Sequence, residues 1–427
     1  MDAQVERSIA AVWRIESAKI VAVVARMVRD VGLAEELAQD ALVAALEHWP
    51  RQGIPDNPGA WLTTTARHAA LDRMRRDRLL RQKLEQIGLD LEAQEALVVP
   101  DFVDTLDAAR NDVFKDDLLR LMFTACHPVL SRDARLALTL KLLGGLSTQE
   151  IARAFLVPEA TMAQRIVRAK RSLGEARVPF ELPPPQELGE RLGAVLEAVY
   201  LIFNEGYTAT AGEDWMRPAL VDEALRLGRM LAELAPGEPE AHGLVALMEL
   251  QASRMGARLD AQGRPVLLLD QDRARWDGVL LRRGLAALER AAGLGRPVGL
   301  ARGAYLLQAE IAACHARAHV ADATDWQAIA ALYGELAQVQ PSPVVELNRA
   351  VAVGMADGPA AGLLLVDALA QEGKLAGYHW LPSVRADLLA KLGRSEEARR
   401  EFERAAAMTA NSRERELLLE RARTLRP

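Results

Sequence analysis

The sequence predicts an all-α protein with more than one domain. Its 427 residues exceed the roughly 100–200 residues of a single domain, so about three domains are expected. Alanine, leucine, arginine and glutamate dominate, and aromatic residues make up only 4% of the chain, a balance that favours helices over sheets. Apolar residues recur at helical spacing, and the C-terminal half shows no strand pattern.

The composition argues against membrane and secreted proteins. The first residues mix charged with apolar side chains, so they form neither a signal peptide nor a membrane span. We therefore expect a cytoplasmic protein with no membrane contact. Two cysteines, Cys126 and Cys314, fall in separate predicted domains, and they indicate neither a disulfide framework nor a zinc site.

Charge is distributed unevenly along the chain. A net charge of −6 argues against a generally basic nucleic-acid binder, but such binding depends on where the charges lie. Residues 67–83 hold seven basic and two acidic side chains, and residues 159–177 hold five basic and two acidic ones. Between them, residues 85–117 hold ten acidic and two basic side chains. The pattern predicts two basic helices separated by an acidic connector.

Two helices are predicted at the start of the chain. The first covers Val5–Val31, with Gly32 as its stop signal, and the second covers Leu33–Trp49. In the second helix one face is apolar and another is acidic and polar. The inward residues are Leu37, Ala41, Leu42, Ala45 and Leu46, and the polar residues are Glu35, Glu36, Gln39 and Asp40.

A loop and a third, basic helix follow. Residues Pro50–Pro58 contain many helix breakers, and Asn57 before Pro58 is typical of a helix cap. The third helix is predicted to run through Trp61 to about Leu84. A shaped loop beside an arginine-rich helix suits a protein that holds a strand opened from duplex DNA. Alternatively, Trp49 and Trp61 are core residues, which is the commoner place for tryptophan.

A helix-turn-helix motif is predicted after the acidic connector. Helical pattern resumes over Leu118–Ala125 and Arg132–Leu143. Ser147 and Glu150 have the spacing of a capping box at the start of a short helix that ends near Phe155. A turn over residues 156–159 leads to a basic amphipathic helix, Ala160–Leu173, offered to a major groove. An ordinary helical hairpin with a solvated basic face is the alternative.

The second helix of this motif carries the candidate DNA contacts. Arginine pairs with guanine and glutamine with adenine, so Thr161, Gln164 and Arg165 are candidates for base edges. Arg168, Lys170 and Arg171 are expected to contact phosphates.

The C-terminal half is predicted to be a helical-repeat region. Prolines between Pro179 and Pro185 predict a stiff extended link. Helical stretches continue from Leu188 to the end, and one unit has the spacing of a tetratricopeptide (TPR) repeat. Its residues are Ala386, Leu389, Gly393, Ala398, Phe402 and Ala405. The segments Pro239–Arg258 and Trp326–Met355 are predicted to be degenerate helix pairs.

Several segments together resemble the extracytoplasmic-function (ECF) sigma factors. Gly32–Leu42, Pro58–Leu62 and Arg67–Arg76 resemble their region two, and Leu146–Phe155, Val157–Thr161 and Arg165–Arg171 resemble their region four. Further segments are similar to the subgroup with a C-terminal helical-repeat extension, so the resemblance covers nearly the whole chain. These are Asn204–Thr208, Gln271–Asp277, Thr324–Trp326 and Pro341–Ala350.

The resemblance implies partners and roles for named residues. Glu35, Glu36, Gln39 and Asp40 would dock on the β′ clamp helices of the RNA polymerase core. The loop and third helix would recognise and open the minus-ten element, while region four would read the minus-thirty-five element and touch the β flap. The acidic connector would thread toward the RNA exit channel. The implied DNA contacts in region two are Asn57, Trp61, Arg67, Arg73, Arg75 and Arg76.

The sequence gives little support to an enzyme in the second half. His315 and His319 are spaced by one helical turn beside Cys314, but no third ligand or general base shows a motif. Glu205 lies in a segment that a helix C-terminus explains equally. No phosphate-binding glycine loop occurs, and no cofactor is expected.

We therefore interpret the chain as an ECF-type sigma factor that is not an enzyme, whose extension regulates it in cis and binds a regulatory protein. The alternative is a helix-turn-helix regulator with a ligand- or partner-binding helical domain, which would not need residues 32–76. The predicted domains are region two at 1–84, an acidic linker at 85–117, region four at 118–178, a proline-rich link at 179–187 and the TPR-like extension at 188–427.

Overall fold

The computed structural model describes residues 3–86, 107–155, 157–209, 215–295 and 302–425. Every regular element within these ranges is a helix, and the β-type pairing among them is an isolated bridge between Leu259 and Pro265. This confirms the predicted all-α class. The chain divides into two compact units, Met1–Ala198 and Val199–Pro427.

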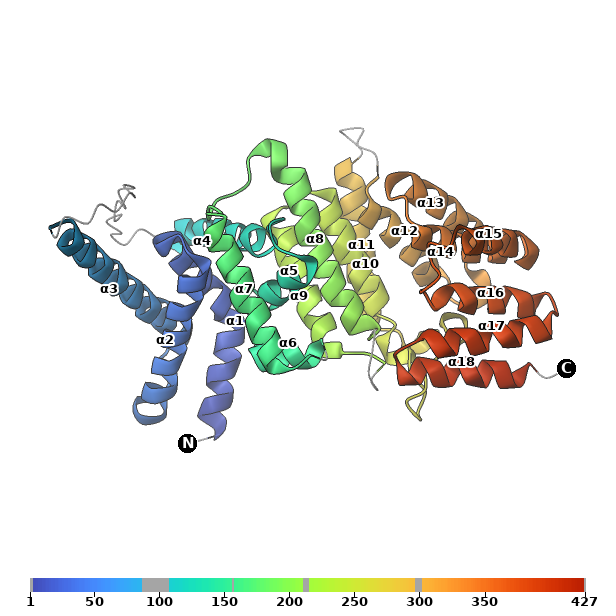
Figure 1. Cartoon of the computed structure of the whole chain (residues 1–427), viewed down its shortest axis with the longest axis horizontal. Coiled ribbons are helices and arrows are strands. Elements are labelled where there is room, and N and C mark those ends of the chain that lie inside the picture. The colour runs from blue at the N-terminus through green and yellow to red at the C-terminus, as the bar shows by residue number, and fades with distance from the viewer. Residues whose placement is uncertain (1–2, 87–106, 156, 210–214, 296–301, 426–427) are drawn as a thin grey trace. The chain divides into compact units, whose positions relative to one another are not determined.

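The first unit begins with three long helices that pack on one another, α1 (Ala3–Val28), α2 (Val31–Gln52) and α3 (Pro58–Gln86) (Figure 1). The break between α1 and α2 comes earlier than predicted. Asp30 is the N-cap of α2 and accepts a hydrogen bond from the Leu33 amide at 2.8 Å. Gly32, predicted to be a stop, lies inside the first turn of α2, because the aspartate cap decides where that helix starts.

The end of α2 also differs from the prediction. Pro50 lies within the last turn of α2, so the connecting loop is shorter than the expected Pro50–Pro58. A proline at an exposed helix end removes one backbone hydrogen bond in a place where water can replace it. Leu46, predicted to face inward, is exposed. The predicted cap at Asn57 is confirmed, because its side chain accepts from the Ala60 amide at 3.0 Å.

A second group of helices completes the first unit: α4 (Asp107–Ala125), α5 (Arg132–Leu142), α6 (Thr148–Ala154) and α7 (Glu159–Glu175). The predicted capping box is confirmed. The Glu150 amide donates to Ser147 Oγ at 3.1 Å, and the Ser147 amide donates to Glu150 Oε2 at 2.8 Å. Most of the predicted acidic connector lies outside the described residues, and its final part forms the start of α4.

The chain is non-helical over residues 176–184, as the proline-rich segment predicts. The next helix, α8 (Pro185–Tyr207), crosses from one compact unit to the next, so the boundary falls inside a helix rather than in the link. No helix in the described ranges has the length and apolar character needed to cross a membrane.

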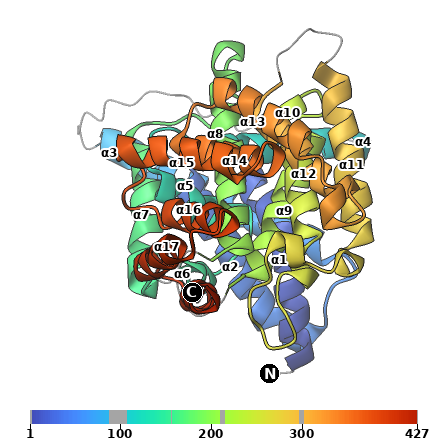
Figure 2. The same cartoon turned by 90° about the vertical axis from the view of Figure 1, so that its right-hand side faces the viewer.

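Most helices of the second unit pack on a neighbour in chain order, and α10 packs on α12 as well as on α11 (Figure 2). The predicted TPR-type unit forms a hairpin, with Ala386, Leu389, Ala398, Phe402 and Ala405 buried and Gly393 at a φ of 75° in the turn. The helices after α8 are α9 (Pro218–Leu234), α10 (Pro239–Ala252), α11 (Gly278–Gly295), α12 (Ala304–Arg317), α13 (Trp326–Val339), α14 (Pro343–Ala356), α15 (Pro359–Glu372), α16 (Trp380–Lys391), α17 (Ser395–Met408) and α18 (Ser412–Thr424).

One of the two predicted degenerate pairs is confirmed. Trp326–Met355 forms the hairpin of α13 and α14, whereas Pro239–Arg258 is the single helix α10 followed by a short 3-10 turn, Met255–Ala257. The helical spacing in Pro239–Arg258 gave no sign of where the helix ends. After Ala252, the chain leaves the helix to form an irregular segment that reaches α11.

We predict opposite effects for two glycine-to-alanine substitutions in the second unit. A Cβ at Gly243 would lie 2.8 Å from the Leu306 amide nitrogen and 3.0 Å from its Cα. This backbone cannot give way cheaply, so Gly243→Ala should lower the free energy of unfolding by about 1–3 kcal/mol. Gly334 lies inside α13 with no atom within 4 Å of such a Cβ. Gly334→Ala should therefore raise stability by up to about 1 kcal/mol. Urea unfolding of the full chain measures both changes, and shifts of the same sign would contradict the packing described.

Candidate nucleic-acid interface

Helix α7 has one buried face and one exposed polar face. Met162, Ile166, Ala169 and Leu173 are buried, and α7 packs on α5 and α6. This spacing of three and four residues places one stripe of the helix against its neighbours. The opposite face is open to solvent and holds four of the predicted DNA contacts, namely Thr161, Gln164, Arg168 and Arg171.

Two predicted contacts on α7 are engaged by other parts of the first unit. Arg165 forms an ion pair with Asp133 of α5 at 3.3 Å, and its side chain is 27% exposed. Lys170 donates to Glu35 of α2. The structure therefore places Lys170 against region-two residues and away from Arg168 and Arg171.

Glu35 lies at the centre of a small buried charge cluster. Its side chain is 6% exposed, and it contacts Lys141 at 3.5 Å as well as Lys170. Gln39 donates to the same carboxylate. A carboxylate buried among two lysines and an amide is compensated, whereas an isolated one would be very costly. Lys141, which no motif indicated, stands alone in the apolar run from Leu138 to Leu143, and this lone charge was its only sequence signal.

The other polar residues of α2 lie differently from Glu35. Glu36 and Asp40 are exposed, and Gln39 is half-buried. The four side chains predicted to bind the polymerase core therefore divide into an exposed acidic pair and an internally bonded pair.

Helix α1 joins the two groups of helices in the first unit. Arg26 forms an ion pair with Asp117 of α4 at 3.2 Å, and Arg14 pairs with Glu150 at 3.5 Å. Burial raises the pKa of Asp117 to about 6, although Arg26 and Arg120 act in the opposite direction. Asp117 was predicted to be the last residue of the acidic linker, but it is a buried residue of α4, because α4 packs on α1.

Helix α3 changes character along its length. Leu62, Ala66 and Ala70 are buried, and α3 packs there on α1 and α2. Beyond Ala70 the helix extends past these neighbours (Figure 1). Its predicted DNA contacts Arg73, Arg75 and Arg76 are exposed there, while Arg67 is half-buried.

The two tryptophans near the start of this helix are buried to different degrees. Trp49 is buried, and Trp61 packs its ring edge-on against it at 5.5 Å between centroids. Trp61 is only half-buried, and Asn57 in front of it is exposed. Trp61 therefore keeps an open side next to the loop that precedes α3.

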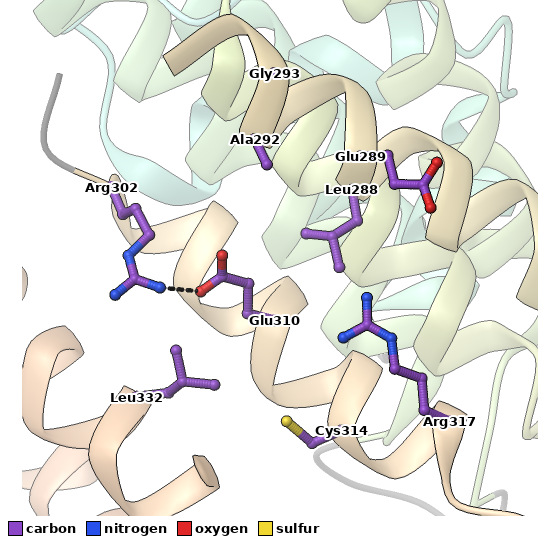
Figure 3. Close-up of a pocket in the computed structure, with 9 residues that line it drawn as sticks. All are labelled: Leu288, Glu289, Ala292, Gly293, Arg302, Glu310, Cys314, Arg317 and Leu332. Atoms are coloured by element: carbon purple, nitrogen blue, oxygen red, sulfur yellow. Dashed lines mark hydrogen bonds and ion pairs between the residues drawn. The ribbon is translucent and has the colours of Figure 1, made fainter. Parts of the chain in front are cut away.

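The second unit contains a pocket of about 470 Å³ beside α11, α12 and α13 (Figure 3). Arg302 donates to Glu310 at 2.6 Å across it. Cys314 also lines the pocket, and burial raises the pKa of its thiol. Burial therefore disfavours the Cys314 thiolate, and Arg302 holds the Glu310 carboxylate.

The side chains considered for metal or acid–base chemistry lie in structural contacts. His315 packs edge-on against Trp326 at 5.2 Å, and burial lowers its pKa to about 4. Helix α12 ends at Arg317, so His319 lies beyond it and does not share a helical face with His315. Glu205 forms an ion pair with Arg217.

We predict that Glu35→Gln destabilises the first unit, because Lys141 and Lys170 would lose their charge partner while remaining only 14% and 17% exposed. The expected loss is about 1–3 kcal/mol. Glu36→Gln, on the exposed face next to it, should change stability by less than about 0.5 kcal/mol. Urea unfolding measures both variants, and Lys170→Met completes a double-mutant cycle. Equal stability of the two glutamine variants would refute the cluster.

Comparison with known proteins agrees with this geometry. The model of Sigma-70 region 2 matches residues 14–79, and that of Sigma-70 region 4 matches residues 120–173. A family of unknown function, DUF6596, matches residues 191–292. The first match covers α2 and most of α3, and the second contains the helix-turn-helix.

Curated relatives extend the match along the chain. An uncharacterised protein of Rhizobium meliloti is 45% identical over 390 residues, which is 91% of this chain and 89% of that protein. The probable ECF RNA polymerase sigma factor SigI of Mycobacterium tuberculosis is 28% identical over 178 residues, 42% of this chain and 58% of that protein. No solved structure matches. The chain therefore belongs to the ECF sigma factors with a C-terminal extension, which act with RNA polymerase and promoter DNA in transcription initiation.

Proposed function

We propose that this sigma factor uses three separate exposed surfaces of its first unit: an acidic patch on α2, the arginine-rich end of α3 and the polar face of α7. The observation that carries the proposal is the exposure of these residues at the ends or faces of helices whose other sides are buried. Arg73, Arg75 and Arg171 form ion pairs with acidic residues of their own helices, but these pairs lie at the surface and leave the side chains accessible to a partner.

The acidic patch, Glu36 and Asp40, is proposed to dock on the β′ clamp helices of the polymerase core. The two carboxylates lie four residues apart on α2, so they share one face of the helix. Their exposure supports this role, whereas Glu35 supports the packing of α2 against Lys141 and Lys170 in this conformation.

The exposed end of α3 is proposed to contact the minus-ten element. Arg73, Arg75 and Arg76 form a positive stretch suited to the phosphate backbone of DNA. Trp61 and Asn57 lie at the other end of the helix, next to the loop, where an unstacked base would meet an aromatic ring and an amide. Trp61 is able to serve both the core and the DNA, because its side chain packs on Trp49 but is only half-buried.

Helix α7 is proposed to read the minus-thirty-five element, with region four also touching the β flap. Thr161, Gln164 and Arg165 lie in its first two turns, where a recognition helix meets base edges. Arg168 and Arg171 lie further along and are exposed for phosphate contacts. Lys170 would reach a phosphate only after its ion pair with Glu35 is broken.

The connector and the C-terminal unit complete the proposal. A path for the acidic connector near the RNA exit channel rests on its charge alone, because residues 87–106 lie outside the described ranges. The second unit is proposed to regulate transcription in cis by binding rather than by catalysis, since stacked helix pairs present extended surfaces. Run-off transcription with purified core polymerase on genomic fragments tests the function, and a failure to start at any promoter would refute it.

We predict that Arg165→Ala and Arg168→Ala weaken promoter binding in different ways. Loss of a base-contacting arginine should cost about 1–3 kcal/mol and relax discrimination at one base pair. Loss of a phosphate contact should weaken all sequences alike and reduce the slope of affinity against salt by about one. Binding to a promoter library at several salt concentrations separates the two effects. The same loss of specificity in both variants would remove the distinction.

We predict that Glu36→Lys combined with Asp40→Lys abolishes binding to core polymerase while the chain stays folded. Like charges facing each other across an interface cost several kcal/mol. The matched control is Glu416→Lys with Glu420→Lys, because these exposed residues have the same spacing on α18 and the same change in charge. Co-purification with core measures the effect. If both double variants bound core equally well, the acidic patch would not be the docking surface.

A further inference from the structure

Sequence segments that the proposed sigma activity does not use converge in the second unit. Arg258, shortly after α10, donates to Thr208 Oγ1 at 2.8 Å, and Arg273 donates to Thr324 Oγ1 at 3.3 Å. The Arg254 guanidinium lies 5.9 Å from the centre of the Tyr207 ring and 6.0 Å from that of Trp276. Four segments far apart in sequence therefore meet around three arginines. We call Tyr207, Arg254, Arg258, Arg273, Trp276 and His315 the arginine–aromatic cluster.

Two of the three arginines bind neutral backbone groups. Arg258 donates to the carbonyl of Tyr207, the last residue of α8. Arg273 donates to the carbonyls of His315 at 2.5 Å and Ala318 at 2.6 Å, at the end of α12. These bonds satisfy carbonyls that helix ends leave open. They do not neutralise the guanidinium charges.

The positive charge of the cluster has no carboxylate partner within the part of the chain that the structure describes. Among the described residues no ion pair joins Arg254, Arg258 or Arg273 to an acidic side chain. Burial lowers the pKa of Arg258 and of Arg273, and the nearby charge of Arg254 lowers both further. Arg258 is buried, and Arg254 and Arg273 are half-buried. Buried charges are normally paired, so a group of guanidiniums with no carboxylate partner among the described residues is unusual.

Unused hydrogen-bond donors, and one histidine nitrogen whose role depends on the tautomer, gather in the same place. The Nε atoms of Arg254 and Arg273, Nε1 of Trp276 and Nδ1 of His315 are buried and have no hydrogen-bond partner in the described part of the chain. Trp276 is 7% exposed, so water reaches its indole N–H poorly. An unsatisfied buried polar group destabilises the fold, and such groups are rare enough to need an explanation.

We propose that the arginine–aromatic cluster binds a small molecule through a carboxylate or phosphate group. An oxyanion would supply the missing counter-charge and accept from the unused donors. Arg254 is the central ligand-binding residue, because its half-buried side chain makes no hydrogen bond within the described residues, whereas the side chains of Arg258 and Arg273 are held by backbone carbonyls. Tyr207 and Trp276 flank its guanidinium and hold it in place.

A ligand site and a purely structural cluster predict opposite effects of removing Arg254. Without a ligand, the positive charge of Arg254 repels those of Arg258 and Arg273, and its buried Nε has no hydrogen-bond partner among the described residues. Both effects lower the stability of the ligand-free chain. Arg254→Met keeps the length of the side chain, so the ligand-free variant should be at least as stable as the natural chain while it loses binding. If Arg254 were structural, the same change would lower stability.

The experiment measures binding of two probes, inorganic phosphate and citrate, to the full chain. Thermal unfolding and calorimetric titration are carried out at ionic strength held constant with potassium chloride, without polymerase or DNA, so that the result does not depend on sigma activity. We expect saturable stabilisation by at least one probe. Phosphate alone would indicate a phosphate ligand, citrate alone a carboxylate ligand, and both a site for either group.

Three variants make the result specific to the cluster. Arg254→Met should weaken binding at least about tenfold, and Trp276→Phe, which keeps a ring but removes the N–H, should weaken it about fivefold to tenfold. Arg290→Met, at an exposed arginine of α11, should bind as the natural chain does. Absence of saturable binding by both probes, or equal binding by Arg254→Met and Arg290→Met, would overturn the proposal.

Discussion

The first unit depends on the burial of helix α1. Six consecutive residues, Ile20–Ala25, are buried on every side of this helix. A helix that is apolar all round must be surrounded, and α1 packs on α2 and α3 on one hand and on α4 and α5 on the other. The region-two and region-four helices, separated by a long acidic connector in the sequence, therefore share one core. This shared burial brings their polar residues within reach of each other.

The contact between Glu35 and Lys170 follows from that shared core. Glu35 belongs to a helix expected to bind polymerase, and Lys170 belongs to the helix expected to bind DNA, yet each is the other's partner. The same conformation leaves Glu36, Asp40, Gln164 and Arg168 exposed. Binding to core polymerase and to both promoter elements would thus begin from the exposed residues. Glu35 and Lys170 would become available to other partners only if the two groups of helices separate. Charge pairs of this kind specify an arrangement more than they stabilise it.

The second unit combines closely packed helices with one irregular polar segment. Some of its helices pack through small residues, as at Gly243 of α10 against Leu306 of α12, where two backbones approach closely. The irregular segment between α10 and α11 brings Arg254, Arg258 and Arg273 together with aromatic rings. Regular repeats need only neighbouring contacts. A polar cluster built from segments more than 100 residues apart therefore marks a specialised site within an otherwise repetitive architecture.

The sequence by itself determined the helical class, the capping box at Ser147 and Glu150, the cap at Asn57 and the buried stripe of α7, because these depend on interactions within a few residues. The tertiary structure alone decided that Glu35 is buried beside Lys141 and Lys170. It also decided that Asp117 is buried and paired with Arg26, and that Leu46 is exposed. It also brought together the residues of the arginine–aromatic cluster, which lie in segments that the sequence showed only as separate stretches of the chain. Side-chain spacing predicts which face of a helix is apolar, but not which distant element will cover it, because that depends on packing across the whole chain.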